Sequence, residues 1–284
     1  MTDDKKDMIG KVCIVTGANS GIGKETALAL ARLGADLVIV CRDQQRGQAA
    51  LQDIKTKSAN NSVELMICDL SSQAQIRKLV EEFKQKYKRL DVLVNNAGVI
   101  LTRRRVTEDG LESTFAINHL AYFLLTNLLL DLIIQSAPAR IVNVSSTVHK
   151  SATIDFDDLQ SERSYSAMRA YGQSKLANVL FTYELARRLE STRVTVNCLH
   201  PGVIATNIFR DISGVVGAAA KLFLKNPRRG AETSIYLATS PEVEGVTGKY
   251  FDDRRAVRSS TESYDEAIAE KLWQVSEQLT NLQA

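Results

Sequence analysis

A glycine-rich turn near the start of the chain constrains the possible folds more than any other feature. Thr16-Gly17-Ala18-Asn19-Ser20-Gly21-Ile22-Gly23 follows a short apolar run, and a helical pattern begins at once. Gly17 and Gly21 allow a tight turn and a close approach to a pyrophosphate, whereas Gly23 allows the helix to pack on the strand. The N-terminus of that helix attracts an anion. A purely structural turn is the alternative, but the flanking strand and helix favour a dinucleotide site.

Two further positions bear on which dinucleotide would bind. Cys41-Arg42 ends the second apolar run, where proteins that bind NAD commonly place a carboxylate for the ribose 2′-hydroxyl. A guanidinium suits a 2′-phosphate, so Arg42 favours NADP, although Asp43 would serve NAD if the strand ended one residue later. Asp69 follows the third run and is placed to meet an adenine amino group, or alternatively to cap the next helix ahead of Ser71-Ser72.

Short apolar runs alternate with longer helical patterns along the chain. Continuous apolar runs such as Leu37-Val38-Ile39-Val40 are typical of parallel strands that are covered on both faces. Joined by right-handed crossovers, they predict an α/β fold with a Rossmann-type, doubly wound parallel sheet and helices on both faces. No linker or repeat divides the sequence, so we expect a single domain over 1–284. The expected strands, seven in all, lie near 11–16, 36–41, 63–68, 90–94, 139–145, 193–199 and 247–251.

The charge balance and the cysteines narrow the classes of function and location. A net charge of +3 argues against a nucleic-acid binder that depends on neutralising phosphates. The 4 cysteines lie in apolar runs without metal-ligand or disulfide-scaffold spacing, which favours a reducing compartment and predicts no metal site. Residues 1–7 match no signal peptide, and no apolar run of 18 residues is expected. We therefore expect a soluble, cytoplasmic protein without a transmembrane anchor.

Four further motifs lie at strand ends or on a predicted helix. These motifs are Asn95-Asn96-Ala97-Gly98, Ser145-Ser146, Tyr171-Gly172-Gln173-Ser174-Lys175 and Pro201-Gly202. Together with the glycine turn, they make the chain resemble the short-chain dehydrogenase/reductase family over residues 10–251. Val40-Cys41-Arg42-Asp43 and the long interval between Ser146 and Tyr171 resemble the retinol dehydrogenase branch. That resemblance implies NADP(H) and hydrophobic carbonyl substrates, although we do not expect the N-terminal anchor of the membrane-bound members.

Tyr171 and Lys175 have a spacing that suits catalysis. They stand one helical turn apart on one face, so an ammonium near the phenol should lower the pKa of Tyr171 toward working pH. Tyr171 would then act as a general acid while the Ser146 hydroxyl holds the substrate oxygen. A tyrosine and lysine pair alone would be typical of an amphipathic helix surface, but the glycine turn favours the catalytic interpretation.

The resemblance assigns the remaining roles. It implies that Ser146 rather than Ser145 is catalytic, that Asn118 carries a water for proton resupply, and that Lys175 reaches the nicotinamide ribose. It also implies that residues 201–206 close over the nicotinamide carboxamide. The expected catalytic set is Asn118, Ser146, Tyr171 and Lys175. The expected cofactor-binding set is Gly17, Ser20, Gly21, Ile22, Gly23, Arg42, Asp69, Leu70, Asn95, Ala97, Gly98, Tyr171, Lys175, Pro201, Gly202 and Thr206.

The segment that follows Thr206 is apolar, with Lys221 as an interruption. We expect residues 207–228 to form a substrate lid hinged at Gly214 and Gly217, with an ordinary core helix as the alternative. An apolar lid predicts a hydrophobic small-molecule substrate. Residues 261–284 should form a C-terminal helix that packs on the core, and the sequence leaves a homo-oligomer open.

These features predict an NADP(H)-dependent oxidoreductase that interconverts a hydrophobic alcohol and its aldehyde or ketone. The alternative is a catalytically silent protein of the same fold that binds and senses NADP(H). The complete set of Ser146, Tyr171 and Lys175 argues against the alternative, because a pure sensor has no evident need for a proton donor.

Overall fold

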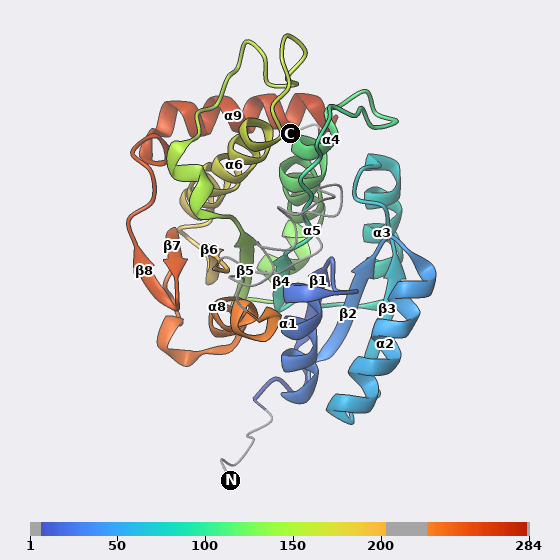
Figure 1. The fold of residues 1–284 in the computed structure, drawn as a ribbon. Coiled ribbons are helices and arrows are strands. Elements are labelled where there is room, and N and C mark those ends of the chain that lie inside the picture. Colours follow the sequence, from blue (N-terminus) through green and yellow to red (C-terminus); the bar gives the residue numbers. More distant parts are fainter. Residues whose placement is uncertain (1–6, 203–225, 283–284) are drawn as a thin grey trace.

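Within residues 7–202 and 226–282, which the computed structural model describes, eight strands form one sheet (Figure 1). Their order is β3-β2-β1-β4-β5-β6-β7-β8; β1 to β7 are parallel, and β8 pairs antiparallel with β7. The predicted Rossmann-type sheet is confirmed. The strands are β1 (Val12–Thr16), β2 (Asp36–Cys41), β3 (Val63–Ile67), β4 (Val92–Asn95), β5 (Ala139–Val144), β6 (Val194–His200), β7 (Lys249–Asp252) and β8 (Arg255–Val257).

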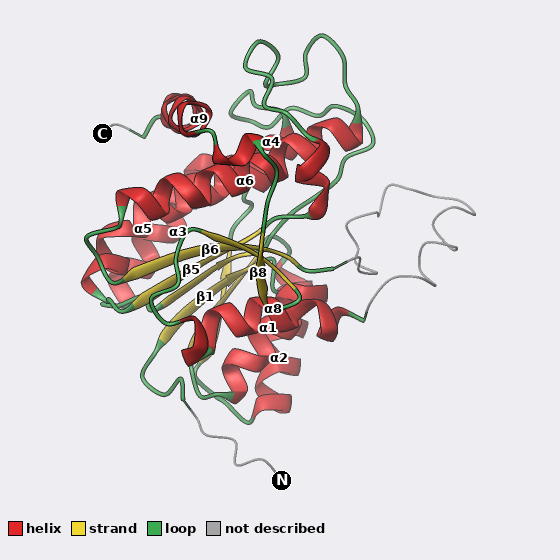
Figure 2. Cartoon of the chain, turned by 90° about the vertical axis from the view of Figure 1, so that its left-hand side faces the viewer, coloured by secondary structure: helices red, strands yellow, loops and turns green. Residues whose placement is uncertain are grey.

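Helices lie in two layers on either side of the sheet (Figure 2). Helices α1, α2 and α8 cover one face, where Leu28, Ile54 and Leu237 join one apolar core. Helices α3, α5 and α6 cover the other face, and α9 packs on the outside of α6. The α-helices are α1 (Gly21–Arg32), α2 (Gln44–Ser58), α3 (Gln73–Lys86), α4 (Ser113–Phe115), α5 (Ala121–Gln135), α6 (Ala167–Arg188), α8 (Pro227–Thr239) and α9 (Glu266–Leu279). Shorter turns are the π-helical η1 (Ala116–Leu120) and the 3-10 helices η2 (Thr147–Ser151), η4 (Pro241–Val243) and η5 (Glu262–Tyr264).

The order of the strands reverses between β1 and β4. Strands β2 and β3 lie on one side of β1, and β4 to β8 lie on the other, so the loops after β1 and β4 lead away in opposite directions. Open α/β sheets bind ligands in the crevice at this point. Strand β1 is buried along its whole length and is paired on both sides, which gives the crevice a rigid floor.

The sheet has one strand more than predicted. Strand β8 is exposed throughout and follows a turn in which Asp253 and Arg254 have φ of 47° and 63°. Because β8 buries no apolar side chain, the apolar pattern carries no signal for it. The C-terminal helix is also shorter than the predicted 261–284, since Asp265 caps α9 by accepting from the N–H groups of Ala267 and Ile268.

The predicted lid over 207–228 lies largely outside the described residues. Thr206, Gly214 and Gly217 also lie outside them. The last two positions of the predicted lid, 227 and 228, begin helix α8. Asn226 caps that helix by accepting from the Arg228 N–H at 3.0 Å.

Among the residues that the structure describes, one apolar helical stretch is long enough to cross a membrane. It runs from Ser113 to Gln135 through α4, η1 and α5, with a mean hydropathy of 1.6. The expectation that no apolar run reaches 18 residues is therefore wrong. Within its 18-residue segment of highest hydropathy, 67% is buried, because α5 packs against α3 and the sheet. Such burial is typical of a core helix.

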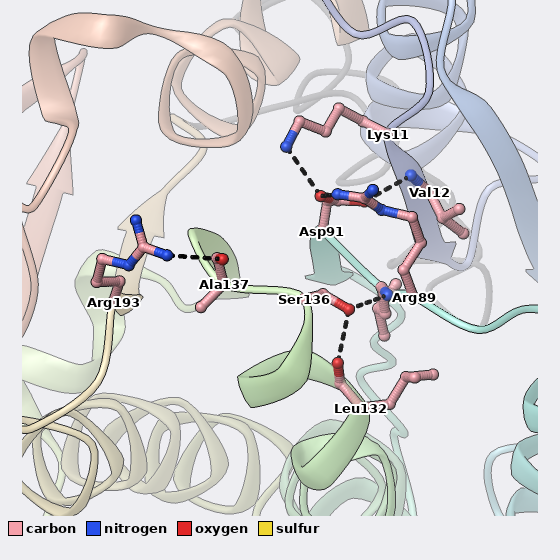
Figure 3. Close-up of polar contacts among 9 residues, drawn as sticks. Lys11, Val12, Arg89, Asp91, Leu132, Ser136, Ala137 and Arg193 are labelled. Atoms are coloured by element: carbon pink, nitrogen blue, oxygen red, sulfur yellow. Dashed lines mark hydrogen bonds and ion pairs between the residues drawn. The ribbon is translucent and has the colours of Figure 1, made fainter.

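A buried carboxylate ties β1 to β4 at the end of the sheet opposite the crevice (Figure 3). Asp91 accepts hydrogen bonds from the Val12 N–H at 2.9 Å and from Lys11 Nζ at 3.0 Å. The Arg89 guanidinium donates two more, at 2.6 and 2.8 Å. Burial alone would raise the pKa of Asp91, but these donors hold it below its usual value.

Candidate active site

A cavity of about 600 Å³ opens at the carboxyl ends of the strands, where the strand order reverses. The glycine turn, the ends of β2 and β3 and the loop after β4 contribute to its lining, and so do η2, α6 and the end of β6. It thus brings together residues far apart in the sequence. The predicted site residues that line it are Gly17, Ser20, Gly21, Ile22, Gly23, Arg42, Asp69, Leu70, Ala97, Gly98, Ser146, Tyr171, Lys175, Pro201 and Gly202.

The glycine turn is too tight for side chains at two of its glycines. Gly17 has a φ of 67°, and a Cβ there would lie 2.9 Å from the Cα of Ala97. A Cβ at Gly23 would lie 2.6 Å from the Gly17 carbonyl oxygen. Ser20 precedes α1 without a side-chain capping hydrogen bond, so its hydroxyl does not compete for the first N–H groups of the helix. The turn therefore fits the pyrophosphate of a dinucleotide.

Two arginines lie at the end of the cavity beyond β2. Arg42 is exposed and lines the cavity together with Arg46. Arg46 was not predicted, although its spacing of one helical turn from Arg42 in the sequence could have indicated that it lines the cavity. The carboxylate of Asp43 caps α2 by accepting from the Arg46 N–H at 2.8 Å. That contact occupies one oxygen of the side chain that would serve NAD.

Asp69 lines the cavity, but it does not cap the next helix. Its Oδ1 accepts from the N–H and the hydroxyl of Ser71 at 2.9 and 2.8 Å. Ser72 caps α3, so the capping alternative for Asp69 is wrong. The Oδ2 of Asp69 lies 3.8 Å from Arg42 Nη1, which links the ends of β3 and β2.

Ser146, Tyr171 and Lys175 come together on the other side of the cavity. The side chain of Ser146, which follows β5, is hydrogen-bonded to the Tyr171 phenol. Lys175 Nζ lies 5.6 Å from the centre of the Tyr171 ring and donates to the Val144 carbonyl at 2.9 Å. The neighbouring Ser145 hydroxyl donates to the main-chain carbonyl of Lys175 at 2.8 Å, so it holds β5 against α6.

The pKa values of Tyr171 and Lys175 differ from the expectation. Burial raises the pKa of Tyr171 to about 12, although the hydrogen bond with Ser146 opposes the rise. Burial also lowers the pKa of Lys175 to about 7. The expected lowering of the Tyr171 pKa is therefore wrong, because burial disfavours the charged form of both groups. Tyr171 therefore carries its proton at neutral pH.

Asn118 does not line the cavity that Ser146, Tyr171 and Lys175 share. It is fully buried in η1, where its side chain accepts from the Val99 N–H at 2.8 Å and donates to the Val99 carbonyl at 3.0 Å. Its main-chain carbonyl accepts from Asn178 Nδ2 at 2.9 Å. Asn118 thereby fixes the loop after β4 against α6. Its predicted role in carrying a water stays a prediction.

Asn95 and Asn96 point to different surroundings. Asn95 is fully buried, and its Nδ2 donates to Thr126 Oγ1 and Asn143 Oδ1, both at 2.9 Å. Asn95 therefore does not line the cavity as predicted, because the alternation of side chains along β4 turns it into the core. Asn96, which was not predicted, lines the cavity and donates to the Thr16 carbonyl at 2.8 Å.

Apolar side chains line the cavity close to Tyr171 and Ser146. Met168 precedes Tyr171 by one turn of α6 and is 53% exposed, and Val148 follows Ser146 in η2. The loop after β4 supplies the others. This apolar wall, whose members are Val99, Ile100, Leu101, Val148 and Met168, suits an apolar substrate group.

The two cysteines that line this cavity are not reactive nucleophiles. Cys41 and Cys68 line it, but burial raises the pKa of each thiol to about 12, which keeps both protonated. Within 7–202 and 226–282, no three His, Cys, Asp or Glu side chains are grouped to hold a metal ion.

Comparisons with known proteins agree with this arrangement. Residues 11–214 match the family model described as short chain dehydrogenase. Retinol dehydrogenase 14 of Homo sapiens is 46% identical over 97% of this chain and 88% of its own length. Retinol dehydrogenase 13 of Homo sapiens is 45% identical over 99% of this chain and 87% of its own length.

Solved structures show the same fold. An uncharacterised protein from Mycobacterium paratuberculosis is 34% identical and has a TM-score of 0.79, with 96% of this chain and 94% of that chain covered. The Pseudomonas aeruginosa RhlG/NADP active-site complex is 27% identical and has a TM-score of 0.71, with coverage of 88% and 97%. The chain therefore belongs to the short-chain dehydrogenase family, and it is a retinol dehydrogenase-like oxidoreductase.

Proposed function

We propose that the protein uses NADP(H) to interconvert a lipophilic alcohol and its aldehyde or ketone. The observation that carries this proposal is the shared cavity. The glycine turn, the hydrogen-bonded Ser146 and Tyr171, and the apolar wall all line it. A dinucleotide bound at the glycine turn and a carbonyl held at Tyr171 would therefore meet within one cavity.

Tyr171 and Ser146 act on the substrate oxygen. In reduction, Tyr171 gives its phenolic proton to that oxygen while the Ser146 hydroxyl holds it in place. A nicotinamide cofactor, when bound, would supply the hydride in this direction and accept it in the other. With a pKa of about 12, Tyr171 carries its proton near neutral pH, which is the state that reduction requires. Lys175, one turn further along α6, donates to the Val144 carbonyl and would meet the cofactor ribose.

Three observations support NADP(H) over NAD(H). Arg42 and Arg46 line the same end of the cavity, and guanidinium groups suit a 2′-phosphate through charge-assisted hydrogen bonds. Asp43, the side chain that would read a ribose 2′-hydroxyl, is engaged as the N-cap of α2. The RhlG structure, 27% identical, is a complex with NADP.

The apolar wall and the relatives support a lipophilic substrate. The wall consists of apolar side chains, although Lys175 and Arg105 also line the cavity, and the two human relatives are named retinol dehydrogenases. We propose retinal-like aldehydes and long alkyl aldehydes or ketones as substrates.

A cytoplasmic location belongs to the same proposal and is supported by the 4 cysteines, all free and buried. Cell fractionation with an antibody to the protein would test the location.

The proposed activity is tested by following NADPH absorbance with a homologous series of aldehydes and with retinal. We expect kcat/KM to rise with the length of the alkyl chain, because each added methylene buries more apolar surface. NADPH affinity is measured in parallel by fluorescence. Tight NADPH binding without turnover of any aldehyde or ketone would instead indicate a silent sensor.

A further inference from the structure

His149 is buried in η2, three residues after the catalytic serine. Its exposed fraction is 0%, and the ring of Tyr250 packs on its imidazole with ring centres 4.7 Å apart. His149 Nδ1 lies 2.6 Å from the main-chain carbonyl oxygen of Ser146. On the other side of the ring, the main-chain N–H of Ser260 donates to His149 Nε2 at 3.1 Å. Both ring nitrogens therefore have a main-chain partner.

These two partners determine the tautomer of His149. A carbonyl oxygen can only accept, so Nδ1 carries the hydrogen, and a main-chain N–H can only donate, so Nε2 is the acceptor. Burial lowers the pKa of His149, although the contact with the Ser146 carbonyl opposes the shift. A charged ring would place a second hydrogen against the Ser260 N–H.

The segment that contacts Nε2 is itself firmly held. Ser259 Oγ lies 2.7 Å from Tyr183 Oη of α6 and also 2.7 Å from Ser263 Oγ. The Ser263 hydroxyl donates to the Ser260 carbonyl at 2.6 Å. The segment between β8 and α9 is thus tied to α6, which carries Tyr171. His149 is braced against the same helix that supplies the proton donor.

We propose that His149 is a positioning residue that holds Ser146 in register with Tyr171 through the contact between its Nδ1–H and the Ser146 carbonyl. The sheet ladder ends at this point with the hydrogen bond from the Ser145 N–H to the Leu199 carbonyl at 2.8 Å, and beyond it the His200 side chain of β6 accepts from the Thr147 N–H at 3.3 Å. Beyond it, the Ser146 carbonyl accepts from both the main-chain N–H and the ring of His149. A displacement of about 1 Å in reacting geometry can lower a rate by about 100-fold.

Two substitutions separate the two sides of the imidazole. In His149→Asn the amide nitrogen takes the place of Nδ1 and can still donate to the Ser146 carbonyl. In His149→Gln the amide oxygen takes the place of Nε2 and can still accept from Ser260, but the donor to Ser146 is gone. Ser260→Ala is the matched control, because it removes the side-chain hydroxyl, which has no partner, and keeps the N–H that His149 uses.

Steady-state kinetics and amide hydrogen exchange over residues 146–152 provide the readouts. We expect His149→Gln to lower kcat by about 10- to 100-fold and His149→Asn by no more than about 3-fold, with the KM for NADPH little changed in both. Exchange of the segment in the protein alone should be faster in His149→Gln and unchanged in His149→Asn and Ser260→Ala. Equal kcat or equal exchange in the two His149 variants, or a larger loss in His149→Asn, would overturn the inference.

The kinetic part of this inference rests on the proposed function. If the wild-type protein reduces no aldehyde or ketone, the proposed function fails, and the exchange comparison alone decides whether His149 holds Ser146. If the wild type is active and the two variants do not differ in kcat, the inference fails and the proposed function stands.

Discussion

Lys175 and Asn178 donate hydrogen bonds to the same oxygen, the main-chain carbonyl of Val144, at 2.9 and 3.3 Å. The amide nitrogen of Asn178 also donates to the Asn118 carbonyl at 2.9 Å. One buried side chain therefore joins the strand that precedes Ser146 to the π-helical turn η1. The position of the Lys175 ammonium depends on a carbonyl that Asn178 shares.

The oxygen of the Asn178 side-chain amide also has a hydrogen-bond partner. Its Oδ1 lies 3.4 Å from His119 Nδ1, and His119 Nε2 lies 3.0 Å from Ser276 Oγ of α9. Burial lowers the pKa of His119 to about 4, so the ring is neutral at pH 7. A chain of hydrogen bonds thus runs from α9 through the core to the carbonyl that holds Lys175.

We expect Asn178→Leu to destabilise the fold and to lower kcat. The change keeps the approximate volume but leaves the Asn118 carbonyl and His119 without their partner, which costs about 1–3 kcal/mol for a buried polar group. Urea unfolding measures the loss of stability. Asn127→Leu is the control, because Asn127 is only partly buried and donates to the Phe123 carbonyl, where water can replace it. Equal losses in the two variants would contradict this account.

The affinity for NADPH should depend on pH through Lys175. Burial lowers the pKa of Lys175 to about 7, and a bound anionic dinucleotide would raise it by favouring the ammonium. The attraction between the Lys175 ammonium and the dinucleotide is then fully present below pH 7. It is lost as the pH rises through the higher pKa that Lys175 has in the complex. Fluorescence titration across this range should show Kd rising with pH in the wild type. In Lys175→Met the Kd should be weaker and nearly flat, and an equal slope in both proteins would exclude Lys175 as the titrating group.

The preference between the two cofactors should depend on Arg42 and Arg46. Arg42→Asp should raise the Kd for NADPH by about tenfold or more, because it removes a charge-assisted contact and adds repulsion to the 2′-phosphate. Arg46→Ala should act in the same direction and more weakly. Titration of NADH against the same proteins is the control, since NADH lacks the phosphate. If the wild type already binds NADH as tightly as NADPH, then Asp43 binds the ribose 2′-hydroxyl and the role proposed for Arg42 is wrong.

Asp91 should contribute to stability without affecting catalysis. Asp91→Asn weakens the contacts to Arg89 and Lys11, and hydrogen bonds to a buried charge are each worth about 1.5–3 kcal/mol. Because the pKa of Asp91 is lowered in the folded state, its contribution is present above the usual carboxyl pKa and is lost as the pH falls through the lowered value. Urea unfolding measures the free energy of unfolding of Asp91→Asn and of the wild type at neutral and acidic pH. The difference between the two proteins should be smaller at acidic pH.

An exposed ion pair provides the control for Asp91. Asp131 lies 2.7 Å from Lys84, and its side chain is 62% exposed, so Asp131→Asn should have little effect on stability. A loss in Asp131→Asn as large as that in Asp91→Asn would show that burial is not the cause.

Local features of the sequence predicted the fold and much of the cavity. The glycine turn was readable because Gly17 and Gly23 must leave room for neighbouring backbone, which is a requirement of the turn itself. The spacing of Tyr171 and Lys175 was readable because a helix places them on one face. The continuous apolar strands predicted the parallel sheet, since both of its faces are covered.

Features that depend on tertiary contacts were not predictable in the same way. Strand β8 has no apolar pattern, and Asn95 turns into the core while Asn96 turns into the cavity. The pKa of Tyr171 rises because burial outweighs its hydrogen bond with Ser146, and burial cannot be read from spacing. The contacts of Asn178 and His149 link segments that are distant in the sequence.

The most direct test of the central claim is Tyr171→Phe, measured for both NADPH binding and aldehyde reduction. The ring still packs in the cavity while the transferable proton is gone, and general acid catalysis is worth about 10²–10⁴ in rate. We predict an unchanged Kd for NADPH and a fall in kcat of that size with a lipophilic aldehyde. Near wild-type kcat in Tyr171→Phe would contradict the account, because the proton would then come from another group.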